Sequence, residues 1–209
     1  MTGLDEFNEL DNAAAIQALL GCCSSSRWAN AVAAARPYHS IHELLTESDR
    51  AVSSLRTADL RAALAGHPRI GDRRVIAGRS SPEASQSAEP PSAADGRPAV
   101  PGVAPAAGTG GLLAGAAIEH STGWSSQEQS GVSTADEEML RDLEEGNRVY
   151  ERRFGHIYLA CASGRTAGEL LALLRERLDN DRETEWGVVA AELAKINRIR
   201  LRRLIGGQA

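Results

Sequence analysis

One stretch of this 209-residue chain limits how it can fold more than any other feature. Six of the eight prolines lie between Gly78 and Gly123, and no Phe, Trp or Tyr occurs between Gly71 and Gly123. Such a stretch buries too little apolar surface to offset its ordering entropy, so we expect a disordered insertion over residues 78–123. Since the length suits one domain, the sequence predicts a single domain over residues 1–209 that the insertion interrupts.

The rest of the sequence has a helical pattern. With 42% hydrophobic but only 4% aromatic residues, the core must come mostly from Ala, Leu, Ile and Val, which favours helices. The apolar run Phe154–Ala162 has no second strand to pair with, and we expect it to be irregular. Capping and breaking residues predict an all-α bundle with helices over 12–21, 27–35, 41–55 (one helix or two), 57–65, from Ser133 or Thr134 to Tyr150, 167–178 and 183–205.

Charge and cysteine content narrow the classes of partner and compartment. A formal net charge of −5 argues against a nucleic-acid partner. No run approaches the roughly 18 continuous apolar residues of a membrane span, and the acidic start lacks a signal-peptide pattern, so we expect a cytoplasmic protein without membrane contact. Cys22 and Cys23 are adjacent and Cys161 is distant, which predicts buried reduced thiols with no disulfide and no metal site.

Arg200 interrupts the apolar face of the last predicted helix. That face runs through Val189, Leu193, Ile196 and Leu204, and Arg200 occupies the position between the last two. A buried guanidinium keeps its proton, so it needs anions or carbonyl groups from an internal partner or a ligand. Alternatively the side chain extends to the rim of the bundle beside solvated arginines. The rarity of buried charge favours this second interpretation.

His67 stands at a predicted helix exit, between Gly66 and Pro68. Pro68 disfavours a helical backbone at His67, so the imidazole can project into a cleft, where its ordinary pKa suits proton transfer. The alternative is an ordinary polar turn residue, and for a lone histidine the sequence favours that alternative.

Ser125 and Glu128 form a third candidate. Their spacing is that of a capping box, which satisfies free amides at a helix start without any catalytic purpose. The same groups at a positive helix end also make a receptor for a polar heterocycle. The spacing leaves both interpretations open.

Several motifs occur in a fixed order: His67-Pro68, Ser125-x-x-Glu128-Gln129, Phe154-Gly155 with its apolar run, Arg177-Leu-x-Asn180 and Lys195-Ile-x-x-Ile-Arg200-Leu. In this order they resemble the 2-oxo-4-hydroxy-4-carboxy-5-ureidoimidazoline (OHCU) decarboxylases of the urate pathway. The resemblance covers nearly the whole chain except the insertion. It implies an all-α, cofactor-free enzyme, usually a homodimer, that removes carbon dioxide from OHCU to give (S)-allantoin.

The resemblance also implies roles for individual residues. His67 matches the catalytic proton donor, and Glu128 and Arg200 complete the catalytic set. The family segment that matches residues 158–162 faces the substrate with its backbone. No metal or organic cofactor is implied, because the substrate supplies its own electron sink. The implied substrate-binding residues are Pro68, Ser125, Ser126, Gln127, Gln129, Tyr158, Leu159, Ala160, Cys161 and Ala162.

A rival hypothesis is a non-catalytic helical interaction module. In it the disordered segment binds partners and the Arg-rich last helix is the docking face. This hypothesis explains the insertion, but it explains neither the position of Arg200 on an apolar face nor the ordered motifs.

Overall fold

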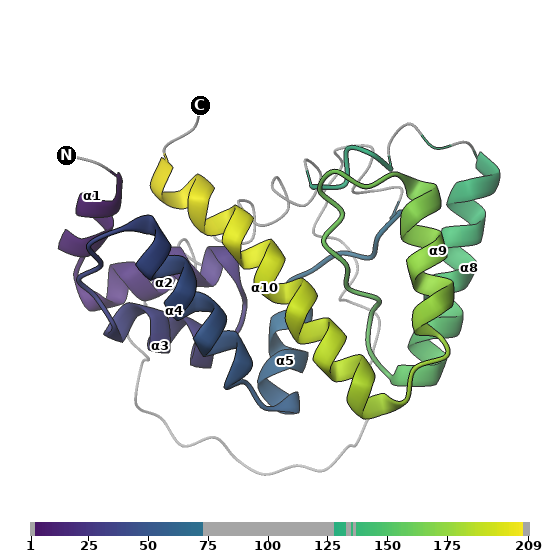
Figure 1. Cartoon of the computed structure of the whole chain (residues 1–209), viewed down its shortest axis with the longest axis horizontal. Helices are drawn as coiled ribbons and strands as arrows, with labels where there is room; N and C mark the ends of the chain where they lie inside the picture. Colours follow the sequence, from purple (N-terminus) through teal and green to yellow (C-terminus); the bar gives the residue numbers. More distant parts are fainter. Residues whose placement is uncertain (1–2, 73–127, 133–134, 136, 207–209) are drawn as a thin grey trace, which may run out of the picture.

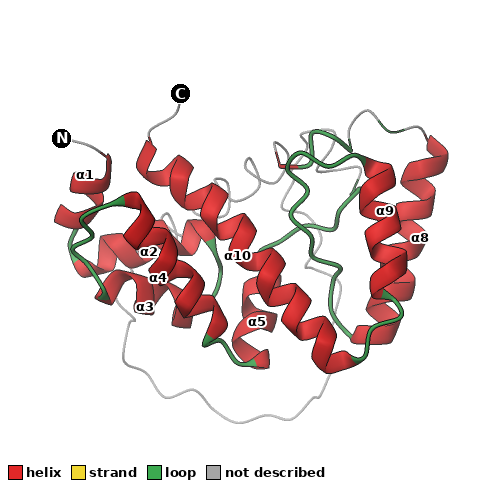
Figure 2. Ribbon diagram, in the orientation of Figure 1, coloured by secondary structure: helices red, strands yellow, loops and turns green. Residues whose placement is uncertain are grey.

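The computed structural model describes residues 3–72, 128–132, 135 and 137–206, and within these ranges all regular secondary structure is helical (Figures 1 and 2). The all-α prediction is therefore confirmed for these ranges. The predicted insertion, residues 78–123, and the predicted helix start at Ser133 or Thr134 lie outside the described residues. The helices are α1 (Gly3–Glu9), α2 (Asn12–Cys22), α3 (Ser26–Ala34), α4 (Ile41–Ser53), α5 (Thr57–Leu64), α8 (Glu137–Phe154), α9 (Ala167–Arg177) and α10 (Arg182–Gly206).

Side-chain caps determine where several helices begin. Asp11 accepts a hydrogen bond from the amide of Ala14 at the start of α2, over 2.8 Å. Thr166 and Glu169 form a reciprocal capping box at the start of α9. Because a cap satisfies amides that have no partner within the helix, it stabilises the helix start by about 1 kcal/mol. The predicted cap at Thr166 is confirmed.

One helix was not predicted, and the structure decides between the two alternatives left open for another. Helix α1 was not predicted, since seven residues form at best a marginal helix alone. It is stabilised by packing on the end of α10, where Phe7 is buried in the same cluster as Ile205. Residues 41–53 form one helix. Its central Ser48 is buried and accepts a hydrogen bond from the indole of Trp28, so this polar position packs inward within the helix.

Helix α10 lies between two groups of helices (Figure 1). On one side its apolar residues share a buried cluster with α1–α5, which includes Leu19, Trp28 and Leu44. On the other side α8 and α9 pack together around a second cluster, which includes Tyr150 and Leu174. The non-helical segment 155–166 runs between these two clusters. It was predicted to be irregular from residue 154, but α8 includes Phe154.

No described helix is long and apolar enough to cross a lipid bilayer.

Cys22, Cys23 and Cys161 are buried free thiols, as predicted. Burial raises the pKa of the Cys22 thiol to about 12, so this group stays protonated at neutral pH.

Candidate active site

A pocket forms where the end of α5, helix α10 and the 155–166 segment meet. It is lined by residues from four separate parts of the sequence, so the fold brings together most of the predicted site. The predicted residues among its lining are His67, Pro68, Glu128, Gln129, Leu159, Ala160, Cys161, Ala162 and Arg200, and Ile70, Ser163 and Ile196 complete it.

Four predicted residues are not part of this lining. The Tyr158 side chain is buried in the cluster of α8 and α9, and its hydroxyl donates a hydrogen bond to the carbonyl of Leu170 over 3.1 Å. The structure thus places Tyr158 behind the pocket. Ser125, Ser126 and Gln127 lie outside the described residues, so both interpretations of the Ser125–Glu128 spacing stay predictions.

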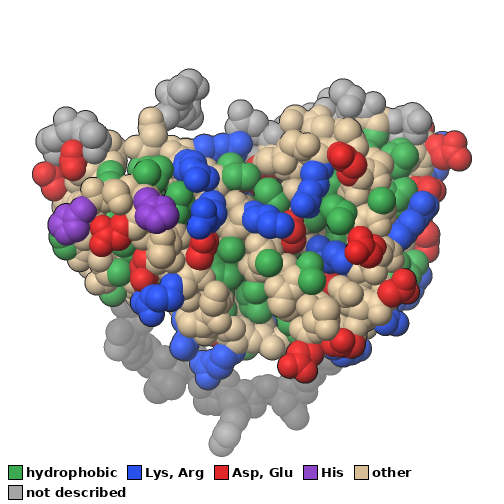
Figure 3. Space-filling model, in the orientation of Figure 1, with side chains coloured by type: hydrophobic (Ala, Val, Ile, Leu, Met, Phe, Trp, Pro, Cys, Tyr) green, Lys and Arg blue, Asp and Glu red, His purple; other side chains and the backbone are tan. Residues whose placement is uncertain are grey.

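Arg200 is 1% exposed and its guanidinium has an internal partner. Its Nε and Nη2 donate to the two carboxylate oxygens of Glu128 over 3.0 and 2.9 Å. Its Nη1 donates to the carbonyl of Cys22 over 3.0 Å. The interpretation in which Arg200 extends to the rim is therefore wrong, and an anion and a carbonyl compensate the buried charge. Lys and Arg side chains do gather on the surface of this face of the molecule (Figure 3), and Arg202 of α10 is exposed.

Glu128 faces a second guanidinium. Nη1 of Arg203 lies 3.8 Å from Oε1 of Glu128, on the side chain that already pairs with Arg200. Gly131 allows the turn that carries Glu128 to approach the end of the 155–166 segment closely, since a Cβ there would lie 2.3 Å from the carbonyl oxygen of Arg165. These two arginines and one glutamate carry one net positive charge, which favours an anionic group nearby.

His67 presents a lone pair to the pocket. Its Nδ1 lies 3.0 Å from the carbonyl oxygen of Ala63, in the last turn of α5. A carbonyl only accepts, so Nδ1 carries the proton of the neutral ring and Nε2 does not. Nε2 is buried and bonds to no residue that the structure describes. Burial, with the charge of Arg200 as a further cause, lowers the pKa of His67 to about 3. The position of His67 in a pocket, with a buried Nε2, favours the cleft interpretation over that of an ordinary polar turn residue.

Gln129 lines the pocket, but its side-chain amide is engaged elsewhere. Its Oε1 accepts a hydrogen bond from the amide of Gly71 over 3.0 Å, and its Nε2 donates to the carbonyl of Arg69 over 3.3 Å. Gly71 has a φ of 81°, which glycine adopts without the penalty of a side chain. Gln129 thus holds the turn that follows His67 and Pro68.

Three buried polar residues near the site were missed by the sequence analysis. Asn147 of α8 donates to the carbonyl of Ile70 over 2.9 Å, and Glu192 of α10 accepts from the amide of Cys161 over 2.7 Å. Glu185 of α10 is fully buried. Each of the three interrupts an apolar helix face, the same signal that singled out Arg200. The amide of Cys161 is therefore not available to a ligand.

The chemistry of the pocket follows from these groups. The described residues contain no cluster of three or more His, Cys, Asp or Glu side chains that could hold a metal ion. The pocket offers a neutral imidazole, a guanidinium paired with a carboxylate, and backbone amides. Such a set suits proton transfer and stabilisation of a developing negative charge on a polar ring.

The chain is similar to a curated protein of known name. The chain is 26% identical, over 188 residues, to the uric acid degradation bifunctional protein TTL of Arabidopsis thaliana. The matched region covers 90% of this chain and 46% of that protein, so the chain spans about half the length of this curated relative.

Two solved structures share the fold. A crystal structure of OHCU decarboxylase in the presence of (S)-allantoin matches with a TM-score of 0.61 and 24% identity, over 90% of this chain and 97% of that chain. A crystal structure of (S)-allantoin synthase matches with a TM-score of 0.59 and 14% identity, over 97% of this chain and 53% of that chain.

The family model described as OHCU decarboxylase matches residues 8–100 and 111–202. The break between these ranges falls inside the predicted insertion. The match supports the decarboxylase interpretation and not the non-catalytic interaction module. Because it covers most of the sequence, including the described part of the pocket, the chain belongs to the OHCU decarboxylase family.

Proposed function

We propose that this chain removes carbon dioxide from OHCU to give (S)-allantoin. The observation that carries the proposal is the buried Nε2 of His67, which bonds to no described residue and lies in the same pocket as Arg200. Family membership supports the choice of substrate. The name OHCU places a hydroxyl and a carboxyl on ring carbon C4 and a ureido group on C5, so the substrate is a polar anion.

The first step breaks the bond between C4 and its carboxylate. The electron pair left behind forms a double bond between C4 and C5, and the adjacent ring nitrogen takes the charge and then a proton from water. Cationic and N–H donors lower this barrier because they meet the charge as it develops. Arg200, Ala160 and Ala162 line the pocket, and we assign the donor role to the guanidinium and to the amides of the two alanines.

The second step moves one proton. His67 is neutral at pH 7, so its Nε2 accepts the proton of the C4 hydroxyl, and the C4 oxygen becomes a carbonyl. The imidazolium then returns this proton to C5. Delivery from a single fixed position reaches one face of the ring, so the product is a single enantiomer.

Other groups hold the substrate. Glu128 accepts from the N–H groups of the ureido or the ring, and its pairing with Arg200 fixes its direction. Pro68 and Leu159 cover the ring, and Ser125, Ser126 and Gln127 add polar contacts next to Glu128.

A turnover assay tests this function. Freshly prepared OHCU is mixed with the purified chain, and the loss of its ultraviolet absorbance and the circular dichroism of the product are followed together. We expect decay faster than in buffer and the signal of one allantoin enantiomer. Decay at the buffer rate with a racemic product would contradict the proposal and favour an interaction module.

We further propose that the protein is a cytoplasmic homodimer. The resemblance of the ordered motifs to dimeric enzymes supports the dimer, and three buried thiols without a disulfide fit a reducing compartment. Sedimentation velocity and cell fractionation test the two points. A monomer at micromolar concentration contradicts the first, and recovery outside the cytoplasm contradicts the second.

A further inference from the structure

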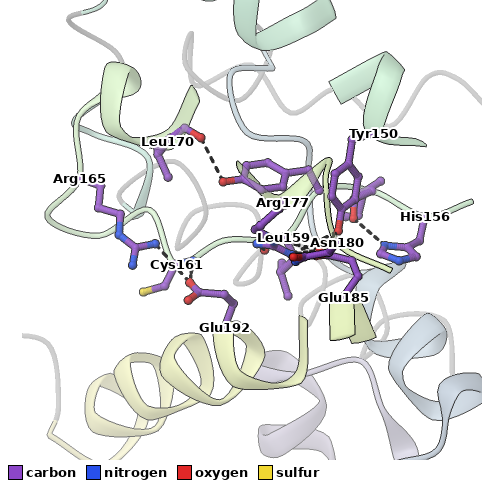
Figure 4. Close-up of polar contacts among 12 residues, drawn as sticks. Tyr150, His156, Leu159, Cys161, Arg165, Leu170, Arg177, Asn180, Glu185 and Glu192 are labelled. Atoms are coloured by element: carbon purple, nitrogen blue, oxygen red, sulfur yellow. Dashed lines mark hydrogen bonds and ion pairs between the residues drawn. The ribbon is translucent and has the colours of Figure 1, made fainter. Parts of the chain in front are cut away.

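Residues 159–162 form one wall of the pocket, and polar side chains of helix α10 contact the segment that contains them, as Glu192 does beside Cys161 and Arg165 (Figure 4). Side chains along this segment alternate between the two buried clusters: Ala160 and Ala162 face the cluster of α8 and α9, whereas Leu159 and Cys161 face the other. Such alternation is typical of an extended chain, in which the N–H and C=O groups of successive residues point to opposite edges. The wall therefore has two different polar edges.

Glu192 holds one point of this wall directly. Its Oε2 accepts hydrogen bonds from the amide of Cys161 over 2.7 Å and from Nη1 of Arg165 over 3.3 Å. Its Oε1 accepts from Nζ of Lys195 over 2.5 Å. Burial opposes ionisation of this carboxyl, but the hydrogen bonds from Lys195 and from the Cys161 amide outweigh it and lower the pKa of Glu192. Glu192, which anchors the wall through the Cys161 amide, is thus a carboxylate at neutral pH.

Glu185 holds a second point through Arg177. The fully buried Glu185 carboxylate accepts from Nε of Arg177 over 2.9 Å and from the amide of Asn180 over 2.8 Å, and also from the Tyr150 hydroxyl. Nη1 of Arg177 then donates to the carbonyl of Leu159 over 2.7 Å. With Glu185 in place, Arg177 has one fixed direction and the Leu159 carbonyl is fixed with it.

The two anchors, Glu192 and the Glu185–Arg177 pair, bind the same edge of the wall. The carbonyl of Leu159 and the amide of Cys161 belong to alternate residues, so they point the same way. Both are occupied by the anchors. The amides of Ala160 and Ala162 point to the opposite edge and make no hydrogen bond to any residue within the described ranges. These are the amides left for a ligand.

We propose that Glu185 and Glu192 are positioning residues that lock the pocket wall with the amides of Ala160 and Ala162 turned toward the substrate. Seven residues separate the two carboxylates, which is two turns of α10, so one helix face carries both. The same face continues to Arg200, and α10 therefore sets the spacing between the wall and the guanidinium. This inference rests on the proposed function, since it assigns those amides to the developing negative charge.

The Glu192 variants give the sharpest test. Glu192→Gln keeps an oxygen that accepts from the Cys161 amide, whereas Glu192→Met keeps the volume without an acceptor. We expect kcat for OHCU to fall about 10- to 100-fold in the Met variant, with KM changed by less than about threefold, and to stay within about threefold of wild type in the Gln variant. Exposed Glu183 on the same helix provides the matched control, as Glu183→Gln.

Amide hydrogen exchange of Cys161, measured by NMR, is a second readout that needs no turnover. It should accelerate at least about tenfold in Glu192→Met and little in Glu192→Gln, because only the Met variant frees this amide. For the other anchor, the variant Glu185→Gln with Arg177→Met leaves no buried charge unpaired and should also lower kcat. Combined with Glu192→Met, its effect on kcat should be less than multiplicative, because both anchors hold one segment.

Three results overturn the inference. The first is an unchanged kcat in Glu192→Met while the wild type turns over OHCU. The second is an equal loss in the Gln and Met variants, which assigns the effect to charge and not to the hydrogen bond. The third is an unchanged exchange rate of the Cys161 amide. A wild-type chain that does not turn over OHCU contradicts the proposed function instead, and the exchange rate then decides the anchoring alone. If the Glu185 double variant does not fold, the Glu192 series is sufficient.

Discussion

The guanidinium of Arg200 and the carboxylate of Glu128 meet through two hydrogen bonds of 3.0 and 2.9 Å, although 72 positions separate the two residues in the chain. Both side chains are buried. The pair therefore joins the last helix to the turn after the insertion, and it does so inside the pocket. Its two members depend on each other for charge compensation, so their substitutions test structure and catalysis together.

Arg200→Met should lower both stability and turnover. Removing the guanidinium leaves the Glu128 carboxylate buried without its main partner, which costs about 3–5 kcal/mol for a buried pair. Arg200→Lys should restore turnover poorly, because an ammonium lacks the planar, forked donors. Urea denaturation and OHCU turnover measure the two effects, with exposed Arg202→Met as the control. A destabilised Met variant with full activity would restrict Arg200 to a structural role.

Glu128→Gln should fold but turn over slowly. The amide oxygen still accepts one hydrogen bond from Arg200, so the site keeps its shape, while the charge that orients both Arg200 and the substrate is lost. We expect kcat to fall by about 10²-fold. Glu138→Gln, an exposed change on α8, serves as the control. Normal turnover in the Glu128 variant, measured in the same assay, would remove this carboxylate from the mechanism.

His67→Asn should abolish most of the activity. Asn fits the helix exit but cannot carry a proton between two substrate atoms, so the rate should fall by about 10²–10⁴, the range for one general acid–base group. His39→Asn, at an exposed position, should have no effect. A His67 variant within about twofold of wild type would show that the proton moves by another route.

Stability should fall as the pH drops below about 6.5, the ordinary histidine pKa. The pKa of His67 is lowered to about 3 in the folded protein, so between these values the unfolded chain binds a proton that the folded one does not. This group then contributes at most about 1.4 kcal/mol per pH unit to the decline. Unfolding free energies of wild type and His67→Asn, measured from pH 7.5 to pH 4, isolate the contribution. Parallel curves would contradict a buried neutral imidazole.

The segment from Gly78 to Gly123 should be dispensable for folding. Its composition provides no aromatic residue and six prolines, so the sequence predicts no contribution to the core. Replacing it by a short Gly-Ser linker should leave the melting temperature within a few degrees of wild type. A chain that no longer folds after this deletion would show that the segment contains an ordered element.

The elements that the sequence predicted best are those with local signals. Thr166 caps α9 and Gly66 follows α5 as expected, because caps and breakers act over a few residues. Helix α1 was missed because its stability comes from packing on a helix nearly 200 residues later. The partner of Arg200 could not be predicted for the same reason, because Glu128 is also distant in the sequence. From the sequence alone, replacing Arg200 by Met is expected to leave the stability level or to raise it, whereas the pairing with Glu128 reverses that expectation.

Sequence reasoning anticipated the position of some site residues but not their hydrogen-bond partners. His67 and Arg200 lie in the pocket, and the ordered motifs were needed to prefer that interpretation. Gln129 lies there too, but its amide binds the backbone near Gly71, which no residue spacing could reveal. The buried carboxylates Glu185 and Glu192 had the same signal as Arg200, a polar residue on an apolar helix face, and a systematic search of that kind would have found them.

Helix α10 carries Glu185, Glu192 and Arg200 on one face. The number of residues between positions 185 and 200 is therefore constrained more strictly than the identity of those residues. Inserting or deleting one residue there rotates everything beyond it by about 100°. Such a change would turn Arg200 away from Glu128 while the wall stayed where it is. Substitutions at exposed positions such as Ala191 leave this alignment intact. Natural and designed variants of this chain should therefore vary in sequence along the outside of α10 and show no gaps within it.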